Sequence, residues 1–289
     1  MLREGFPALN EFIDIESALA QAVASLEPVS ESPRLDAELL LARALDVSRS
    51  YLFAHPEDTL DPAASERFFS VVDRRAAGEP IAYITGEREF WSMNLMVSPA
   101  TLVPRPETEL LVERALMLIP RKANMRILDL GTGSGAIALA IARERPLCEI
   151  IATDASAEAL AIARQNARQL DVANVVFHHG NWTDPVRGQQ FNLVVSNPPY
   201  VRADDPQLKT LRHEPASALA SGSDGLDAIR HIAATAADTL TDDGTLMLEH
   251  GSEQQQQVAD ILRRCGWTEI ECVSDYAGLP RVTVARPAK

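Results

Sequence analysis

The sequence predicts an α/β protein with two domains, a small helical bundle followed by a mostly parallel sheet with helices on both faces. Residues 1–78 show apolar residues at helical spacing throughout. From Arg126 onward, short apolar strands alternate with longer helical segments, which is typical of parallel strands joined by helices. Residues 79–104 differ from both, because rough alternation with aromatic and turn residues predicts a β-hairpin linker. The second domain is then expected over 105–289, and a chain of 289 residues is long enough for two domains.

The helices of the first domain carry clear start and stop signals. Ser32 precedes Pro33, and Asp61 precedes Pro62, so that a favoured N-cap residue stands before a proline at the first helical position. Gly78 ends the last helical pattern of this region. These signals predict a small helical bundle.

The second domain contains seven strand patterns. Five of them are RILDLG, EIIATD, VVFHHG, FNLVVSN and TLMLEHG, and the last two lie around Glu269 and Val282. Helical patterns begin at Ser134 and Ser156, run from about Leu226 to Leu240, and pass through Gln257. We therefore expect a seven-stranded, mostly parallel sheet.

Composition limits the classes of function. The formal net charge is −14, and residues 1–104 hold 8 basic against 17 acidic residues. Affinity for nucleic acid comes largely from lysines and arginines, so this balance argues against a nucleic-acid substrate. The opening residues lack the apolar core of a signal peptide, and no uncharged apolar run reaches the roughly 18 residues of a membrane span, which predicts a cytoplasmic protein. Three cysteines without metal-ligand spacing predict free thiols and no metal site: Cys148, Cys265 and Cys272.

A glycine loop follows the first strand of the second domain. In GTGSG, Gly131, Gly133 and Gly135 let the backbone turn sharply and approach a ligand at a helix N-terminus. Asp154, at the end of the next strand, stands where an acid would bind ribose hydroxyls. With Ala136, the loop also satisfies the dinucleotide pattern GxGxxA, so a dehydrogenase and a methyltransferase are both open at this point.

An acid before the loop favours S-adenosylmethionine. Asp129 lies two residues before the first glycine, as in the methyltransferase pattern D/ExGxGxG. A carboxylate there could complement the cationic amino group of the cofactor's methionine portion, directly or through water. The loop therefore favours a methyl donor over a dinucleotide.

The sequence NPPY ends the fourth strand, FNLVVS. In an open parallel sheet ligands lie beyond the carboxyl ends of the strands, so Asn197 should face the glycine loop. An NH₂ group presented there needs two acceptors, and the Asn197 side-chain oxygen and the Pro198 carbonyl can each take one hydrogen. Neither Pro198 nor Pro199 donates from its backbone, and Tyr200 can offer a flat face to a planar amide or base.

NPPY resembles the signature of methyltransferases that act on nitrogens attached to planar groups. Further segments look like those of the release factor glutamine methyltransferases, the PrmC/HemK family, over nearly the whole chain. They are PIAYITGEREFW at 80–91, LVPRPETELLV at 102–112, SPRLDAELLLARAL at 32–45, LMLEHG at 246–251 and DYAGLPRV at 275–282.

This resemblance implies a Rossmann-like domain that uses S-adenosylmethionine and leaves S-adenosylhomocysteine. The implied reaction methylates the glutamine side-chain amide in the Gly-Gly-Gln motif of peptide chain release factors, and so supports translation termination. It also implies a protein substrate, no direct nucleic-acid substrate and no membrane; we expect a monomer, with residues 1–78 as the substrate-recognition domain. The alternatives are a ribosomal protein glutamine methyltransferase, a nucleic-acid amino-methyltransferase and a non-catalytic nucleotide-binding protein.

Motif matching assigns the site residues. The cofactor would contact Asp129, Gly131, Thr132, Gly133, Ser134, Gly135, Asp154, Trp182 and Asn197. The glutamine would contact Asn197, Pro198, Pro199 and Tyr200, of which Asn197, Pro198 and Tyr200 are the catalytic candidates. One position departs from the family, because Asn181 stands where an Asp is usual before the tryptophan. We nominate neither Glu249 nor His250 as a base, since the methylated amide nitrogen is acidic enough to lose its proton to water; both are interpreted as structural.

Overall fold

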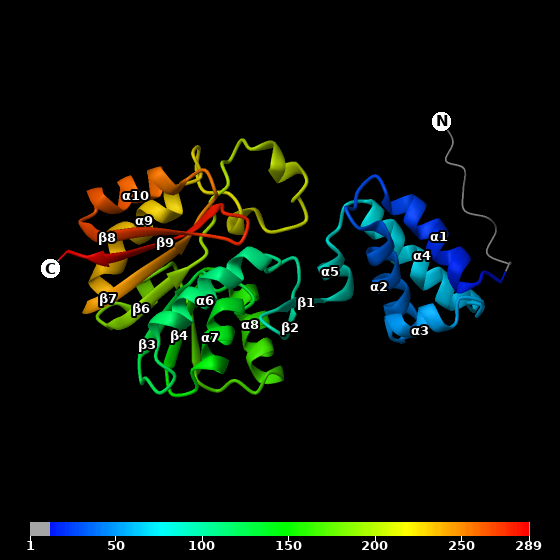
Figure 1. The fold of residues 1–289 in the computed structure, drawn as a ribbon, viewed down its shortest axis with the longest axis horizontal. Helices are drawn as coiled ribbons and strands as arrows, with labels where there is room; N and C mark the ends of the chain where they lie inside the picture. Colours follow the sequence, from blue (N-terminus) through cyan, green and yellow to red (C-terminus); the bar gives the residue numbers. More distant parts are fainter. Residues whose placement is uncertain (1–11, 289) are drawn as a thin grey trace. The chain divides into compact units, whose positions relative to one another are not determined.

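A computed structural model describes residues 12–288 of the chain, and the segment that argued against a signal peptide lies almost wholly outside this range. The chain forms two compact units that divide between Gly86 and Glu87 (Figure 1). This division falls inside the segment 79–104, where the sequence predicted a linker.

The first unit is a helical bundle. Its helices are α1 (Ile15–Leu26), α2 (Pro33–Leu45), α3 (Arg49–Ala54), α4 (Pro62–Ala76) and α5 (Ile81–Thr85). Ser32 and Asp61 precede α2 and α4 as expected, and the Asp61 carboxylate accepts a hydrogen bond from the Ala64 amide at 2.7 Å. The core is apolar and includes Phe68 at its centre, with no exposed surface. Because α5 has only five residues, its pattern IAYIT is too short to be told from a strand.

The second unit opens with a hairpin. Strands β1 (Glu87–Phe90) and β2 (Met93–Met96) pair in antiparallel register. Trp91 and Ser92 form its turn with φ of 51° and 54°, the left-handed conformation that tight hairpin turns require. The Glu109 side chain accepts a hydrogen bond from the Trp91 amide at 2.9 Å and so supports this turn.

A seven-stranded sheet forms the centre of the second unit, in the order β5-β4-β3-β6-β7-β9-β8. The strands are β3 (Arg126–Leu130), β4 (Glu149–Asp154), β5 (Val175–His179), β6 (Phe191–Ser196), β7 (Leu240–Glu249), β8 (Trp267–Ser274) and β9 (Pro280–Pro287). Within this sheet β9 runs antiparallel to both of its neighbours, β7 and β8, and the other neighbouring strands pair in parallel register. The expected fold class, a mostly parallel Rossmann-like sheet, is confirmed.

Helices cover both faces of this sheet (Figure 1). Helices α6 (Glu109–Leu118), α7 (Ala136–Glu144) and α8 (Ala157–Gln169) lie on one face, and α9 (Asp227–Thr235) and α10 (Gln255–Arg264) lie on the other. Neighbouring residues of one strand serve opposite cores: Ile127 packs with α6 and α7, and Leu128 packs with α9 and α10. Short 3₁₀ turns complete the unit: η1 (Pro106–Thr108), η2 (Asp184–Val186), η3 (Pro206–Lys209), η4 (Ala216–Ala218) and η5 (Ala236–Thr239).

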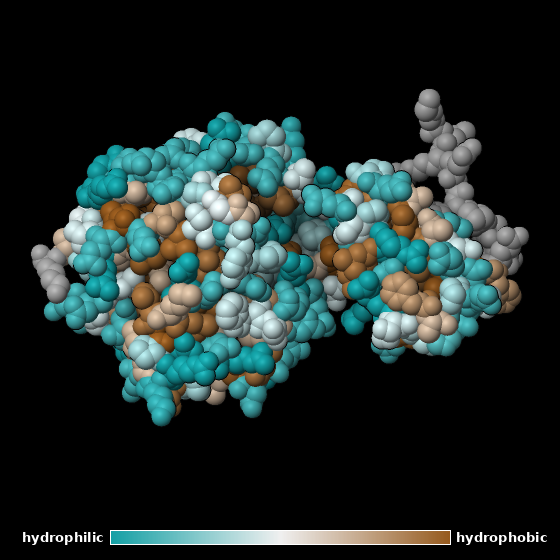
Figure 2. Space-filling model, viewed as in Figure 1, coloured by the Kyte–Doolittle hydropathy of each residue, from teal (hydrophilic) through white to brown (hydrophobic). Residues whose placement is uncertain are grey.

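The surface of each unit is largely hydrophilic in the view of Figure 2, with hydrophobic side chains in separate patches. Among residues 12–288, no helix combines the length and the apolar character needed to cross a bilayer.

Candidate active site

The register of the sheet aligns the ends of four parallel strands. Leu130 of β3 pairs with Thr153 of β4 and with Ser196 of β6, and Ser196 pairs with Leu248 of β7. The order of strands reverses between β3 and β6, which is where open α/β sheets bind ligands. The residues that directly follow this row are Asp154, Gly131, Asn197 and Glu249.

A cavity of about 660 Å³ opens at this edge, a size suited to a small-molecule cofactor. Eight residues that the sequence assigned to the site line it: Gly131, Thr132, Gly133, Ser134, Asp154, Trp182, Asn197 and Pro199. The other four assigned residues are not among its lining residues: Asp129, Gly135, Pro198 and Tyr200. The cavity thus brings the glycine loop and the NPPY loop together.

The glycine loop turns tightly against β4. The Gly131 and Thr132 amides both donate to the Thr153 carbonyl, at 2.9 and 3.0 Å. Gly131 has φ of 73°, and a Cβ there would lie 3.4 Å from the Trp182 ring. Gly135 has φ of 86°, and a Cβ there would lie 3.0 Å from Leu139 and 3.3 Å from another side chain. Both positions therefore combine a left-handed backbone with limited space, which favours glycine.

The Asp154 carboxylate connects the glycine loop to the residue before α8. One oxygen of its carboxylate accepts from the Gly133 amide and the other from the Ser156 amide, each at 2.8 Å. Each carboxylate oxygen can accept more than one hydrogen bond, so this group keeps capacity for two hydroxyls. Asp154 also lines the cavity, as a ribose-binding acid would.

Asp129 lies beneath the glycine loop and has no exposed surface. Its Oδ2 accepts from the Thr132 hydroxyl at 2.6 Å and from the Ala138 amide at 3.2 Å. Its Oδ1 has no hydrogen-bond partner among the described residues. Burial raises the pKa of this carboxyl to about 7, and the negative charge of Asp154 adds to the rise. An unpartnered buried oxygen of this kind is suited to a ligand donor.

Trp182 takes a left-handed backbone conformation, with φ of 43°. Its carbonyl accepts from the Thr153 hydroxyl at 2.9 Å, and its side chain packs against the core beside α9. Such a conformation is rare for a bulky residue and persists where surrounding contacts hold it. The exposed Asn181, the position that departs from the resemblance, lines the cavity next to it.

The Asn197 side chain has a defined orientation. Its Nδ2 donates to the Thr108 hydroxyl oxygen at 3.0 Å, across 89 residues of sequence. This contact engages the NH₂ group and leaves Oδ1 as the acceptor of the amide. Pro198 is buried behind it, and Pro199 continues along the cavity wall.

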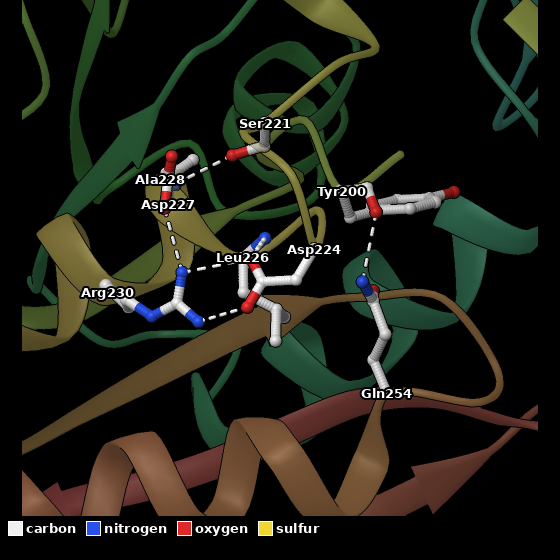
Figure 3. Close-up of polar contacts among 8 residues, drawn as sticks. All are labelled: Tyr200, Ser221, Asp224, Leu226, Asp227, Ala228, Arg230 and Gln254. Carbon is white, nitrogen blue, oxygen red and sulfur yellow. Dashed lines mark hydrogen bonds and ion pairs between the residues drawn. The ribbon is translucent and has the colours of Figure 1, made fainter. Parts of the chain in front are cut away.

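The loop that carries Tyr200 is fixed from two sides, and Figure 3 shows one of them, the contact with Gln254. Gln254 donates from Nε2 to the Tyr200 carbonyl at 3.0 Å, and its Oε1 accepts from the Gly251 amide at 2.9 Å. Gly225 packs so closely that a Cβ there would lie 2.3 Å from the same carbonyl. Burial, and then the charge of Glu249, raises the pKa of the Tyr200 phenol to about 12, so this ring stays neutral.

A compact turn returns the chain from this loop to α9 (Figure 3). The Ser221 hydroxyl accepts from the Ala228 amide at 2.8 Å. Arg230 pairs with both Asp224 and Asp227. The turn closes the segment 201–226, which supplies three lining residues: Pro215, Ser217 and Ala218.

Glu214 holds the segment 201–226 in place beside the cavity. This residue was not identified from the sequence. Its buried carboxylate accepts from the Val103 amide at 3.0 Å and pairs with Arg105, which lines the cavity. No local pattern marks Glu214, because its partners lie more than 100 residues away.

His250 is engaged at both ring nitrogens. Its Nδ1 lies 2.9 Å from the Gly251 carbonyl, so Nδ1 carries a proton and Nε2 accepts from the Thr283 hydroxyl at 2.8 Å. Burial lowers the pKa of this imidazole. This environment agrees with the structural interpretation of His250.

The chain matches known families along most of its length. Residues 17–86 match the PrmC N-terminal domain, and residues 121–276 match a methyltransferase domain. A release factor glutamine methyltransferase of Coxiella burnetii is 48% identical over 95% of this chain and 99% of its own length. One of Escherichia coli is 44% identical over 93% of this chain and 97% of its own length. The chain belongs to the release factor glutamine methyltransferase family.

The fold of this family member also occurs among more distant methyltransferases. A solved structure of a 16S rRNA N2 G1207 methyltransferase of T. thermophilus, in complex with AdoMet and guanosine, matches with a TM-score of 0.53 at 16% identity. The match covers 70% of this chain and 49% of that one. At this level of identity the likeness concerns the fold.

Proposed function

We propose that this protein transfers the methyl group of S-adenosylmethionine to the side-chain amide nitrogen of the glutamine in the Gly-Gly-Gln motif of peptide chain release factors. The observation that carries the proposal is the position of Asn197. The register sets it directly beside the glycine loop, and its NH₂ group is turned to Thr108, which leaves its oxygen as an acceptor. Family membership supports the release factor as the substrate.

The residues around the cavity fit S-adenosylmethionine. Backbone amides of the glycine loop lie at the start of α7, and Asp154 can accept from the ribose hydroxyls. Asp129 does not line the cavity, so its unpartnered Oδ1 can complement the amino group through water. The bound cofactor supplies an electrophilic methyl group on a sulfonium. The remaining task of the protein is to hold and orient the glutamine amide.

An amide nitrogen is a weak nucleophile because its lone pair is delocalised into the carbonyl. Asn197 Oδ1 and the Pro198 carbonyl each accept one N–H of the glutamine, which fixes the amide plane and favours localisation of the lone pair toward the methyl group. In-line positioning of this kind contributes up to roughly 7–11 kcal/mol. As the methyl group passes to the nitrogen, its bond to sulfur would break and leave S-adenosylhomocysteine, and the nitrogen would become acidic and release one proton to water. No strong base is required.

The helical unit is the candidate for recognition of the release factor. A glutamine side chain offers little surface, so selecting one glutamine requires contacts far from the methyl group. The acidic first part of the chain suits a basic partner surface and would mainly speed encounter. We place the reaction in the cytoplasm, where translation terminates, and assign it to a monomer.

The other methylation targets are less well supported. The chain spans 97–99% of the relatives named above, including the PrmC N-terminal domain, and these relatives are named for release factors. Its acidity also disfavours a nucleic-acid substrate.

Mass spectrometry of a co-expressed release factor tests the proposal. We expect one added methyl on its Gly-Gly-Gln peptide with the intact protein. Asn197→Ala should lower turnover on the order of 10²–10³-fold, by analogy with loss of one oxyanion-hole donor, while S-adenosylmethionine still binds. Near-normal turnover of this variant would refute the assigned mechanism, and methylation of a ribosomal protein in place of the release factor would refute the substrate.

A further inference from the structure

Glu249 is a buried carboxyl beside the candidate catalytic amide. It follows Leu248, and Asn197 follows Ser196, the register partner of Leu248. Its exposed fraction is 1%, and its Oε2 has no hydrogen-bond partner among residues 12–288. Because Glu249 is not among the residues that line the cavity, it is suited to act through a neighbour.

Thr108 provides the connection. Its hydroxyl oxygen accepts from Asn197 Nδ2 at 3.0 Å, so its own hydrogen is free to reach a second acceptor. The side chains of Thr108 and Asn197 both lie close enough to Glu249 to lower the pKa of its carboxyl, against the larger effect of burial. This arrangement permits a relay from Asn197 N–H to Thr108 O–H to the Glu249 carboxylate.

This relay decides which end of the Asn197 amide faces the cavity. The oxygen and nitrogen of an asparagine have nearly the same shape, and rotation of the amide by 180° exchanges an acceptor for a donor. A carboxylate only accepts, so it keeps the NH₂ group on its own side and the oxygen on the other. A protonated carboxyl can donate, and it then stabilises the rotated amide as well.

We propose that Glu249 is a positioning residue that, through Thr108, holds Asn197 with its oxygen toward the substrate. The inference rests on the proposed function, because it assigns Asn197 Oδ1 the task of accepting a hydrogen of the glutamine amide. It adds a role for a residue that the sequence interpreted as structural.

The surroundings of Glu249 make this arrangement sensitive to pH. Burial raises the pKa of the Glu249 carboxyl to about 7, with a contribution from Glu107, against the opposing effects of Thr108, Arg281 and Asn197. Tyr200 faces the same group and stays neutral, since its own pKa is raised to about 12. The adjacent His250 is bound to Gly251 and Thr283. Glu249 therefore changes charge near neutral pH, and the ionised form is the one that holds Asn197.

The experiment measures kcat against pH for release factor methylation by the full-length protein at saturating S-adenosylmethionine. Wild type should lose activity as the pH falls through about 7. Glu249→Gln should lower kcat at pH 8 on the order of 10- to 100-fold, since small misplacements of reacting groups have effects of this size, and should abolish the pH inflection. Its cofactor affinity should not change. Glu253→Gln, at an exposed carboxylate of the following loop, is the matched control and should behave as wild type.

Thr108→Val provides a second variant that keeps the shape of the side chain and removes the hydroxyl. It should lower kcat, and its combination with Glu249→Gln should lower kcat little further, because both act on one relay. Wild-type kcat at pH 8 from a Glu249→Gln protein, an unchanged inflection in that variant, or full activity of Thr108→Val would overturn the inference. Absence of turnover by wild type would instead refute the proposed function.

Discussion

Two buried carboxyls of the second unit, Asp129 and Glu249, differ from Glu38 of the helical unit in how they are paired. In the helical unit, Glu38 accepts from Arg34 at 2.7 Å and from Arg49 at 2.6 Å, which pairs both of its oxygens. In the second unit, Asp129 and Glu249 are as deeply buried, yet each keeps one oxygen without a hydrogen-bond partner among the described residues. A buried acid that is fully paired stabilises its fold, and one that is left partly unpaired is available to a ligand or to a neighbouring catalytic group.

The pKa values follow the same division. Burial alone would raise the pKa of Glu38, but the hydrogen bonds from Arg49 and Arg34 outweigh it and the net shift is downward. For Asp129 and Glu249 burial dominates, and each pKa rises to about 7. Glu38 thus stays ionised to a lower pH than an ordinary glutamate, whereas Asp129 and Glu249 titrate near neutrality.

Removal of the helical unit should give the largest effect, because it separates cofactor binding from recognition of the release factor. A protein that begins at Glu87 should bind S-adenosylmethionine with unchanged affinity, because every lining residue of the cavity lies after that point. It should methylate intact release factor on the order of 100-fold more slowly, since remote contacts supply part of the transition-state binding. Calorimetry and a methylation assay measure the two quantities.

A Gly-Gly-Gln peptide is the control substrate for this truncation. It lacks the remote contacts, so both forms should methylate it equally slowly. Equal rates of the two forms on intact release factor would contradict the recognition role assigned to residues 1–78, and joint loss of folding and cofactor binding would show that the helices serve stability instead.

The next effect concerns Asp129 and the cofactor. Asp129→Asn should weaken S-adenosylmethionine binding about 10- to 100-fold at pH 8, corresponding to about 1.5–3 kcal/mol for a hydrogen bond to a charged group. Because the carboxyl has a raised pKa of about 7, wild-type affinity should fall as the pH drops below that value, whereas the variant should show no such change. Titration calorimetry at pH 6 and pH 8 measures both.

Asp36→Asn is the matched change in the helical unit. Asp36 is also buried, but it pairs with Arg75 at 2.8 Å and accepts from Ser30. It should leave cofactor affinity unchanged at either pH. An equal loss of cofactor affinity in the two variants would contradict the inference that a partly unpaired buried acid serves the cofactor and a paired one serves the fold.

Local patterns predicted the glycine loop and Asn197 because both directly follow strands, and parallel strands end at one edge of the sheet. The roles of Thr108 and Glu214 in the site depend on contacts across 89 and 111 residues, which no local pattern encodes. Asp129 shows a third case. Its position before the loop was predicted, but its depth beneath Thr132 and Ala138 results from the packing of α7.

The smallest expected effect is on local stability, and it should differ in sign between the units. Glu38 has a lowered pKa, so its pairing stabilises the fold above its unfolded pKa and is lost as the pH falls through the folded pKa. Glu38→Gln should therefore destabilise the helical unit at pH 7 by about 1–2 kcal/mol, less than loss of a fully buried pair because Arg34 and Arg49 are partly exposed and can be resolvated.

Glu249 has a raised pKa, so its contribution to stability is present below its unfolded pKa and is lost as the pH rises through about 7. Glu249→Gln should then match wild-type stability in acid and exceed it at pH 8. Hydrogen–deuterium exchange of peptides from each unit measures these changes separately. Destabilisation by Glu249→Gln at pH 8 would mean that this acid, like Glu38, is retained for the fold, whereas a gain in stability with a loss of turnover identifies a buried charge that is kept for catalysis at a cost to the fold.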